Sequence, residues 1–423
     1  MPYDVAAFRA QFPALREGGA HFDGPGGSQT PAAVAQAVSD ALTSAVANRG
    51  DVTPAERRAD AIVLAARAAI ADLLNADAQG IVFGRSMTQL TYDVSRALAE
   101  TWRPGDEVVV TRLDHDANVR PWVQAAQAAG AQVRFADFDP VTGELTADHV
   151  TAVLTERTRL VAVTAASNLI GTRPDIAAIM AAAHGVGAIG YVDGVHATAH
   201  HSIDVAALGA DLFVCSPYKF LGPHCGALAG RVDLLESLRP DKLLPSTDAV
   251  PERFELGTLP YELLAGVTAC VDVLAALAPS GGGDASGGGD TSGANLDADR
   301  ADHATRRARL VAAFAAIEAH EDRLRARIEE ALAELGATVY SRAARRTPTL
   351  LFRLPGVADG EVRRGLAARG VNAPNGNFYA IECSRRLGLG DEGGVRVGLA
   401  PSSDDSDVDR LIEGLREIVR PPR

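Results

Sequence analysis

Short apolar segments alternate with helical segments between residues 80 and 215 of the chain. The apolar segments are continuous runs, which is typical of parallel strands buried on both faces. The pattern predicts an α/β fold with a mostly parallel sheet, and ligands bind such sheets at the carboxyl ends of the strands. The predicted strands are Gly80–Phe83, Glu107–Thr111, Gln132–Ala136, Leu160–Thr164, Ala188–Val192 and Leu212–Cys215. The predicted helices are Pro31–Ala47, Glu56–Leu74, Ser86–Ala99, Asn118–Ala129, Ala147–Leu154 and Pro174–His184.

Composition divides the 423 residues into four segments. Residues 1–30 form an N-terminal segment, and residues 31–260 form a large α/β domain. Residues 261–298 hold a connecting helix and a Gly/Ser/Asp-rich stretch, 279–294, which we expect to be a flexible surface insertion because it cannot bury a core. Residues 299–423 form a smaller α+β domain. Its predicted elements are helices over 299–335 and 405–418 and strands over 338–340, 347–353 and 395–399.

Charge and cysteine content exclude several classes of function. Lys and Arg number 41 and Asp and Glu 54, a net charge of −13 that repels nucleic acid and anionic membranes. The four cysteines form no CxxC pair, so neither a zinc site nor a disulfide framework is expected. No apolar run is long enough to span a bilayer, and residues 1–15 lack a signal-peptide core, so a cytoplasmic location is expected.

Only two of the 41 basic residues other than histidine are lysines, Lys219 and Lys242. A GC-rich genome explains the preference for arginine, but arginine cannot replace lysine as an amine nucleophile because its guanidinium stays protonated. Lys219 lies in a turn directly after the strand that ends at Cys215, where strand ends meet a cleft. Lys242 lies in a polar loop and is interpreted as a surface residue. Lys219 is therefore the candidate for covalent chemistry.

A carboxylate and a possible anion site accompany this lysine. Asp193 follows a predicted strand, and a strand-end aspartate paired with a strand-end lysine fits a pyridoxal 5'-phosphate (PLP) site. The lysine would form a Schiff base and the aspartate would pair with the pyridinium nitrogen. Ser86, Met87 and Thr88 open a predicted helix, whose first N–H groups favour a phosphate. Each signal alone also fits an ordinary turn or helix cap.

Several stretches together resemble the class V aminotransferase family of fold-type I PLP enzymes, in the branch of cysteine desulfurases and selenocysteine lyases. They are FDGPGGSQTP, TRLDHDANVRPW, TAASNLIGT, YVDGVHATAH, CSPYKFLGPHCGAL, FELGT and VRVGLA. The resemblance runs from about Phe22 to the C-terminus, interrupted by the Gly-rich stretch. It implies PLP as cofactor, an amino-acid substrate and a homodimer with shared active sites, with no nucleic-acid or membrane partner and no metal.

The resemblance also assigns roles to individual residues. Lys219 matches the Schiff-base lysine, Asp193 the pyridinium partner and His115 the histidine that stacks on the ring. Arg396 matches the arginine that pairs with the substrate carboxylate, a role that suits its bidentate fork. Thr258 matches a threonine donated to the partner subunit's phosphate site. Asn168 matches the asparagine near the ring hydroxyl, and Thr88 and Ser216 match phosphate ligands. The predicted cofactor-binding set also includes Ser86 and Met87, from the helix start, and His196 and Tyr218.

Two departures from the family lie beside the cofactor, and a third affects the chemistry. His196 stands where glutamine is usual, and Tyr218 where histidine is usual; both can still hydrogen-bond the cofactor. Desulfurases carry a nucleophilic cysteine on a loop over the cofactor, and here Asn377 or Phe378 stands near that position. Asn377 is accordingly a candidate substrate-binding residue. Cys383 could accept sulfur only if this loop were rearranged.

The sequence therefore predicts a desulfurase-like carbon–sulfur lyase that works by β-elimination and forms no protein persulfide. An aminotransferase or an amino-acid epimerase on the same cofactor frame is the alternative. A dinucleotide-binding protein using Gly24–Gly27, or a scaffold without activity, is a weaker hypothesis, because this glycine run does not follow a strand and open a helix.

Overall fold

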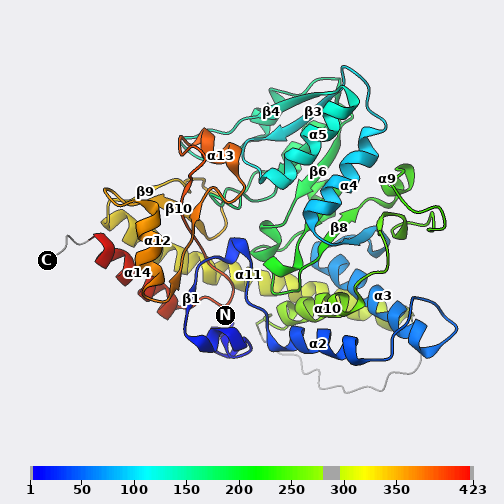
Figure 1. Cartoon of the computed structure of the whole chain (residues 1–423), viewed down its shortest axis with the longest axis horizontal. Helices are drawn as coiled ribbons and strands as arrows, with labels where there is room; N and C mark the ends of the chain where they lie inside the picture. The colour runs from blue at the N-terminus through cyan, green and yellow to red at the C-terminus, as the bar shows by residue number, and fades with distance from the viewer. Residues whose placement is uncertain (1–2, 280–295, 420–423) are drawn as a thin grey trace.

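Seven strands form the main sheet, in the order β2-β8-β7-β6-β5-β3-β4 (Figure 1). The computed structural model describes residues 3–279 and 296–419, so the predicted insertion at 279–294 lies outside the described residues apart from Pro279. The strands are β2 Ile81–Gly84, β3 Glu107–Thr111, β4 Gln132–Ala136, β5 Thr158–Thr164, β6 Ile189–Asp193, β7 Leu212–Cys215 and β8 Gly226–Gly230. The six predicted strands are confirmed, three of them with their predicted bounds.

One strand of this sheet, β8, was not predicted from the sequence. It pairs antiparallel with both β2 and β7, whereas the other neighbouring pairs are parallel. Its sequence, GALAG, consists mostly of small residues and lacks the branched apolar residues that signal a strand. Since only β8 is reversed, the carboxyl ends of β2, β3, β5, β6 and β7 meet at one edge of the sheet. This edge is where the prediction places the ligand.

Helices cover both faces of the main sheet. On one face Val109 and Phe213 pack with residues of α3, α7 and α10. On the other face their neighbours Val108 and Leu212 pack with α4 and α5, so the strands are buried on both sides as predicted. The bounds of these helices are α3 Pro54–Leu74, α4 Met87–Ala99, α5 Arg120–Ala129, α7 Ile176–Gly185 and α10 Tyr261–Ala275. The remaining helices of this part of the chain and of the C-terminal region are α1 Val5–Arg9, α2 Ala32–Thr43, α6 Ala147–Thr151, α8 Val205–Leu208, α9 Val232–Ser237 and α13 Ile381–Arg386.

A second, antiparallel sheet lies in the C-terminal region, in the order β12-β13-β10-β9. It packs against α12 and α14 through a core of its own. The strand β10 begins two residues later than predicted because Pro348 has no N–H to pair. The elements are β9 Thr338–Val339, β10 Thr349–Arg353, β12 Asn375–Gly376, β13 Gly394–Gly398, α12 Asp359–Ala367 and α14 Asp405–Val419.

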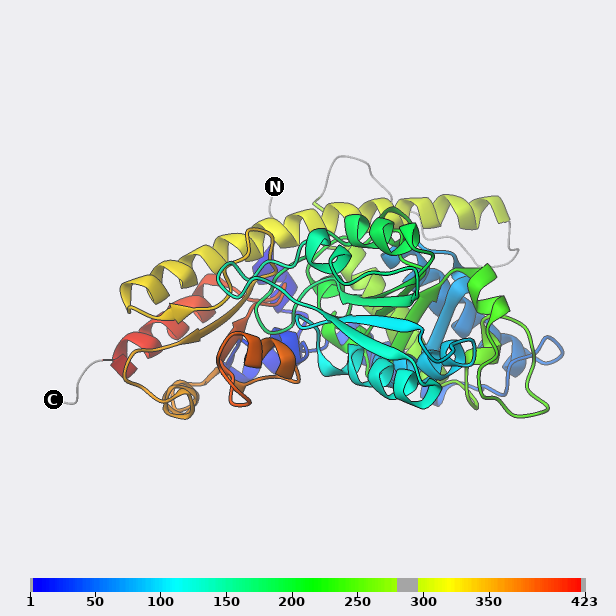
Figure 2. The ribbon, with the colours of Figure 1, turned by 90° about the horizontal axis from the view of Figure 1, so that it is seen from above.

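Two connections join the main sheet to this C-terminal region. Figure 2 shows the long helix α11, Leu296–Glu334, lying along both. Its Phe314 belongs to the core of the main sheet and its Ile328 to the core of the smaller sheet. The N-terminal strand β1, Ala20–His21, pairs in parallel with β11, Val371–Asn372. The N-terminal segment therefore reaches the C-terminal sheet next to the edge where the strands of the main sheet end.

Within residues 3–279 and 296–419, no helix has the length and hydropathy required for a bilayer span. Those residues also hold no cluster of three or more His, Cys, Asp or Glu side chains placed to bind a metal ion.

Candidate active site

A cavity of about 500 Å³ opens at the carboxyl edge of the main sheet. A second cavity of about 60 Å³ lies deeper, and Asp193 and His196 line it. The residues that line both cavities are Thr88, His115, Asn168, Tyr218 and Lys219. Residues predicted from five separate stretches of sequence are thus brought together in one place.

Lys219 follows β7 and ends a short 3-10 turn, Pro217–Lys219. Its Nζ donates a hydrogen bond to the carbonyl oxygen of Pro25. Burial and the charge of Arg396 lower the pKa of Lys219 to about 8, although Asp23 and Asp193 act in the opposite direction. A neutral amine, the nucleophilic form, is therefore far more accessible here than in a solvated lysine.

Asp193 is the last residue of β6 and is only 4% exposed. The N–H of Val195 donates to its Oδ1 at 2.9 Å. Burial raises the pKa of Asp193 to about 6, against the effects of this hydrogen bond and of Lys219. Among the described residues the carboxylate has no other hydrogen-bond donor. It can accept a further N–H in the deep cavity, and a cation there would favour its ionised form.

His115 follows β3, and its ring is held in one tautomer. The N–H of Ala117 donates to Nδ1 at 3.0 Å, so the proton of the neutral ring is on Nε2. Burial and the charges of Lys219 and Arg396 lower the pKa of His115 to about 4. The ring is therefore neutral near pH 7, and it stacks with Tyr379 at 5.4 Å between ring centroids.

The start of α4 reaches the cavity at Met87 and Thr88. Ser86 caps this helix, since its hydroxyl accepts from the N–H of Gln89 at 3.1 Å. The reversed strand β8 fixes the position of this helix start, because a Cβ at Gly226 would lie 2.3 Å from the carbonyl carbon of Ser86. A helix N-terminus with free N–H groups is suited to an anion.

Two further side chains have buried atoms without a partner among the described residues. Nε2 of His196 lies 2.9 Å from Thr347 Oγ1 and 3.0 Å from Thr349 Oγ1, whereas its Nδ1 has no partner. Asn168 donates through its amide to the carbonyl oxygen of Phe378 at 2.9 Å, and its Oδ1 has no partner. Both side chains line a cavity, so a ligand bound there could pair these atoms.

Arg396 projects from β13 on the opposite side of the cavity and is 2% exposed. Its Nη2 donates to Asp23 Oδ1 at 2.6 Å, and its Nη1 donates to the carbonyl oxygen of Asn168 at 3.0 Å. The guanidinium carbon lies 3.6 Å from the centroid of the Phe378 ring. Burial lowers the pKa of Arg396 to about 10, while Asp23 opposes that shift. Arg396 remains positively charged at neutral pH.

The loop after β12 closes the cavity with two aromatic residues. Phe378 and Tyr379 both have positive φ, 51° and 61°, which is strained for residues with a side chain. The N–H of Asp116 donates to the carbonyl oxygen of Tyr379 at 2.7 Å. Asn377 lies in the same loop, but its amide donates to the carbonyl oxygen of Asp391 at 2.7 Å. Phe378 and Tyr379, and not Asn377, line the cavity.

Four predicted site residues do not line either cavity. Ser86 is engaged as a helix cap, Ser216 is buried after β7, and Asn377 is bonded within its loop. Thr258 is exposed on a segment between the main sheet and α10. The roles predicted for these four residues stay predictions.

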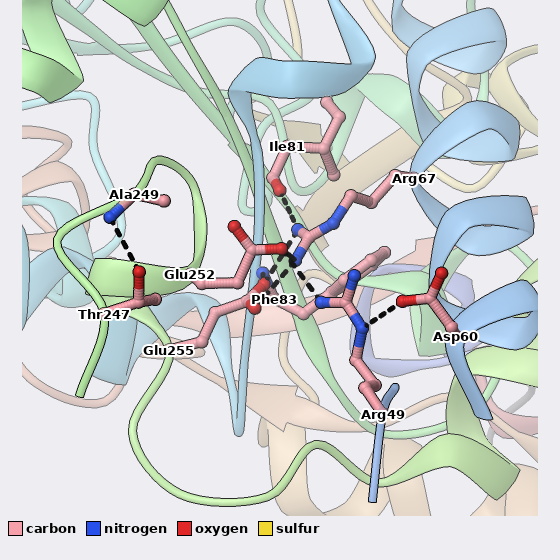
Figure 3. Close-up of polar contacts among 9 residues, drawn as sticks. All are labelled: Arg49, Asp60, Arg67, Ile81, Phe83, Thr247, Ala249, Glu252 and Glu255. Carbon is pink, nitrogen blue, oxygen red and sulfur yellow. Dashed lines mark hydrogen bonds and ion pairs between the residues drawn. The ribbon is translucent and has the colours of Figure 1, made fainter. Parts of the chain in front are cut away.

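An ion-pair network holds the segment that precedes Thr258 (Figure 3). Arg67, 3% exposed, donates through both terminal nitrogens to Glu255 at 2.9 and 2.8 Å. Glu255 also accepts from the N–H of Phe83, in β2, at 2.8 Å. Arg49 bridges Glu252 and Asp60 beside this pair. The network fixes the 252–255 segment to the strand that leads into the start of α4.

All four cysteines of the chain are buried, and none lines the cavities. Cys383 lies in α13, and burial raises its pKa well above the ordinary value. Lys242, the second lysine, is bonded within its own loop to the carbonyl oxygen of Ser246 at 2.8 Å. Neither residue has access to the cavities.

Comparison with known proteins places this fold and cavity in a family. The sequence model described as Aminotransferase class-V matches residues 20–279. The chain belongs to the class-V aminotransferase family. Enzymes of this family typically depend on PLP, and the main sheet with its smaller C-terminal sheet is the fold type I predicted from the sequence. Gly24–Gly26 forms a 3-10 turn, not the strand–helix turn that a dinucleotide site requires.

Three relatives show where this class-V protein stands within the family. An uncharacterised protein of Mycobacterium tuberculosis (strain CDC 1551 / Oshkosh) is 33% identical over 422 residues, covering 99% of this chain and 100% of the relative. A cysteine desulfurase of Dickeya dadantii (strain 3937) is 30% identical over 442 residues, covering 99% and 97%. The crystal structure of the Escherichia coli cysteine desulfurase CsdA, in its S-sulfonic acid form, superimposes with a TM-score of 0.81 at 28% identity, covering 98% of both chains. The class-V protein is a cysteine desulfurase-like enzyme.

Sequence reasoning missed several residues of the cavity. Asp23, Tyr92 and Tyr379 line it, as do Asp116 and its ion-pair partner Arg120. Asp23 and Asp116 stand inside stretches that carry the family resemblance, FDGPGGSQTP and TRLDHDANVRPW, which was the available signal. Tyr92 is one helical turn after Thr88 on α4, so helix periodicity could have placed it.

Proposed function

We propose that the protein is a PLP-dependent carbon–sulfur lyase that acts on an amino acid by β-elimination and forms no protein persulfide. The observation that carries this proposal is the composition of the cavity: Lys219, Asp193 and His115 line it, and no cysteine of the chain does. The net reaction converts the amino acid and water into pyruvate, ammonia and the protonated sulfur leaving group. This product is hydrogen sulfide from cysteine, a small-molecule persulfide from cystine and a sulfenic acid from a sulfoxide.

The cavity residues fit PLP group by group. Asp193 has acceptor capacity for a ring N–H, the orphaned atoms of Asn168 and His196 suit the ring hydroxyl, and His115 supplies a neutral ring to stack. The N-terminus of α4 at Met87 and Thr88 suits the phosphate, with Ser86, Ser216 and Tyr218 nearby. When bound, PLP supplies an aldehyde that condenses with amines and a ring that withdraws electrons from the substrate α-carbon.

Lys219 acts as the acid and base of the reaction. Its Nζ is partly neutral near pH 7 because burial and Arg396 lower its pKa to about 8. A neutral amine can take the α-proton and, once protonated, can return it to the sulfur leaving group or to carbon. Asp193 holds a proton on the ring nitrogen throughout, since its buried carboxylate requires a cationic partner.

Arg396 binds the substrate carboxylate in this proposal, and the aromatic loop limits access to the substrate. The guanidinium of Arg396 lies in the cavity under the ring of Phe378. Cys383 is fully buried in α13 and would reach a substrate sulfur only after the loop had moved. The sulfur product therefore leaves through the open cavity as a small molecule.

A substrate screen with two cysteine variants tests the proposal. The protein is incubated with cysteine, cystine and S-alkyl cysteine sulfoxides, and pyruvate, alanine and sulfide are measured. We expect pyruvate in equal yield from the wild type, from Cys383→Ala and from Cys225→Ala, which removes a matched buried thiol. Alanine in place of pyruvate, lost only in Cys383→Ala, would establish a persulfide route and contradict the proposal.

An aminotransferase or epimerase uses the same residues when the substrate has no leaving group. For transamination Lys219 would return the proton to the cofactor carbon, and for epimerisation a second proton donor would have to protonate the opposite face of the α-carbon. Amino-group transfer that depends on an added keto acid, or inversion at the α-carbon without pyruvate, would favour these activities over elimination.

We also propose a homodimer in which Thr258 reaches the partner subunit's phosphate site. Thr258 is exposed, and the ion pair between Arg67 and Glu255 holds the segment that precedes it in a fixed position; both features support this proposal. Mixing Lys219→Ala with Thr258→Ala subunits tests it. Shared sites predict that one site of each mixed dimer is fully wild type, so activity should rise above that of either variant alone. Unchanged activity in a demonstrated mixed dimer would contradict site sharing.

A further inference from the structure

Asp23 lies in the cavity but has no role in the function proposed above. Its carboxylate oxygen is 2.6 Å from Nη2 of Arg396, so it holds the group that is assigned to the substrate carboxylate. The chain thus places a carboxylate of its own on Arg396, where the substrate carboxylate is proposed to bind. Asp23 is about one third exposed and faces the cavity, whereas Arg396 is buried.

The backbone around Asp23 fixes this juxtaposition. Asp23 forms a parallel bridge with Gly398, two residues after Arg396 on β13. The next residue packs so closely that a Cβ at Gly24 would lie 2.4 Å from the carbonyl oxygen of Leu399. The N–H of Gly398 also donates to the carbonyl oxygen of Phe22 at 2.8 Å, which ties the backbone beside Asp23 to β13. We therefore expect Arg396 to be released by a rotation of the Asp23 side chain.

Asp23 uses only one of the hydrogen bonds that the guanidinium of Arg396 can donate. Nη1 donates to Asn168, Nη2 donates to Asp23, and the buried Nε has no partner among the described residues. An incoming carboxylate can form two parallel hydrogen bonds with a guanidinium, whereas Asp23 forms one. A ligand with a carboxylate can thus compete for the site, and a ligand without one leaves the Asp23–Arg396 pair intact.

We propose that Asp23 is a specificity-determining residue, an internal carboxylate on Arg396 that the substrate carboxylate has to displace. It neutralises the buried guanidinium when an amine without a carboxylate binds, and it weakens the binding of every amino acid by competing with it. Asp23 therefore determines the affinity of the cavity for amino acids relative to its affinity for amines without a carboxylate. The proposal rests on the proposed function only in taking Arg396 as the receptor for the substrate carboxylate.

Propionate, which has a carboxylate but no amine to react with the cofactor, is the probe. Its dissociation constant is measured by calorimetry on the full chain, with and without added PLP, for wild type, Asp23→Asn and Asp23→Ser. We expect both variants to bind propionate about tenfold more tightly than wild type, as expected when a charged hydrogen-bonding competitor is removed. Both should also melt at a lower temperature without propionate, and propionate should raise their melting temperature more than that of wild type.

Three controls make the result decisive. Asp116→Asn removes one negative charge from the same cavity without touching Arg396, so its gain in propionate affinity should be smaller than that of the Asp23 variants. Propionamide, the neutral analogue, should bind no variant, and Arg396→Gln should abolish propionate binding. Equal or weaker binding by folded Asp23 variants, binding that survives Arg396→Gln, or no binding by any protein would each overturn the proposal. None of these measurements depends on carbon–sulfur cleavage, so failure of the proposed function would be seen separately in the substrate screen.

Discussion

The two sides of the cavity are built in different ways. The sheet-edge residues each end or follow a strand of the main sheet and are anchored by strands buried on both faces. These residues are Thr88, His115, Asp193 and Lys219. The closing residues come from three segments that meet through the pairing of β1 with β11, the pairing of β12 with β13 and the bridge from Asp23 to β13. These residues are Asp23, Phe378, Tyr379 and Arg396. We infer that the sheet edge determines which chemistry is possible, and that the closing residues determine which substrate is accepted.

This division predicts its largest effect at Lys219. Lys219→Ala should lower kcat by about 10³-fold and abolish the visible absorption band of bound PLP, because no other amine lines the cavity. The chain supplies a matched control in its second lysine. Lys242→Ala removes an amine that is bonded within its own loop and should leave both kcat and the band unchanged. Loss of the band in Lys242→Ala would mean that the reactive lysine has been misassigned.

The next largest effect is expected at Asp193. Asp193→Asn keeps the shape of the side chain but removes the charge that holds the ring nitrogen protonated. It should lower kcat by about 10²-fold with little change in KM. Steady-state kinetics on the substrate found in the screen checks this split. A change confined to KM would mean that Asp193 contributes to substrate binding. The sheet edge would then not be reserved for the chemical step.

The pH dependence of Lys219 tests whether the two sides are electrostatically independent. The pKa of Lys219 is about 8, against 10.5 for an ordinary lysine, so the rate of its reaction with added PLP should rise with pH to a midpoint near 8. Arg396→Gln removes a positive charge that lowers this pKa, so the midpoint should move to higher pH. Asp193→Asn removes a negative charge that raises it, so the midpoint should move to lower pH. Stopped-flow absorbance across the pH range measures the midpoint of the wild type and of both variants. An unchanged midpoint in Arg396→Gln would show that the closing residues do not affect the pKa of Lys219.

The same division explains how much could be predicted from the sequence. Lys219 and Asp193 were predictable because each follows a continuous apolar run, a pattern contained within ten residues. His115 and Arg396 needed the family resemblance as well, since a turn histidine and a strand arginine have ordinary explanations of their own. Asp23 stands in a family-resemblance stretch, but neither its place beside Arg396 nor that of Tyr379 could be predicted from the local pattern. Pairing of strands only two residues long, β1 with β11 and β12 with β13, brings their segments to the cavity. Thr258 stays a prediction, since its role involves a partner subunit.

The smallest effect is expected at Phe378, whose ring covers Arg396 at 3.6 Å. Phe378→Ala removes a cation–π contact and admits water to a buried guanidinium, so the substrate carboxylate should bind more weakly. KM should rise about threefold to tenfold while kcat stays within about twofold, because the sheet-edge residues are untouched. Phe378→Tyr keeps an aromatic ring over the guanidinium and serves as the rescue variant. If Phe378→Ala lowered kcat as strongly as Asp193→Asn, the aromatic loop would contribute to the chemical step and not only to substrate binding.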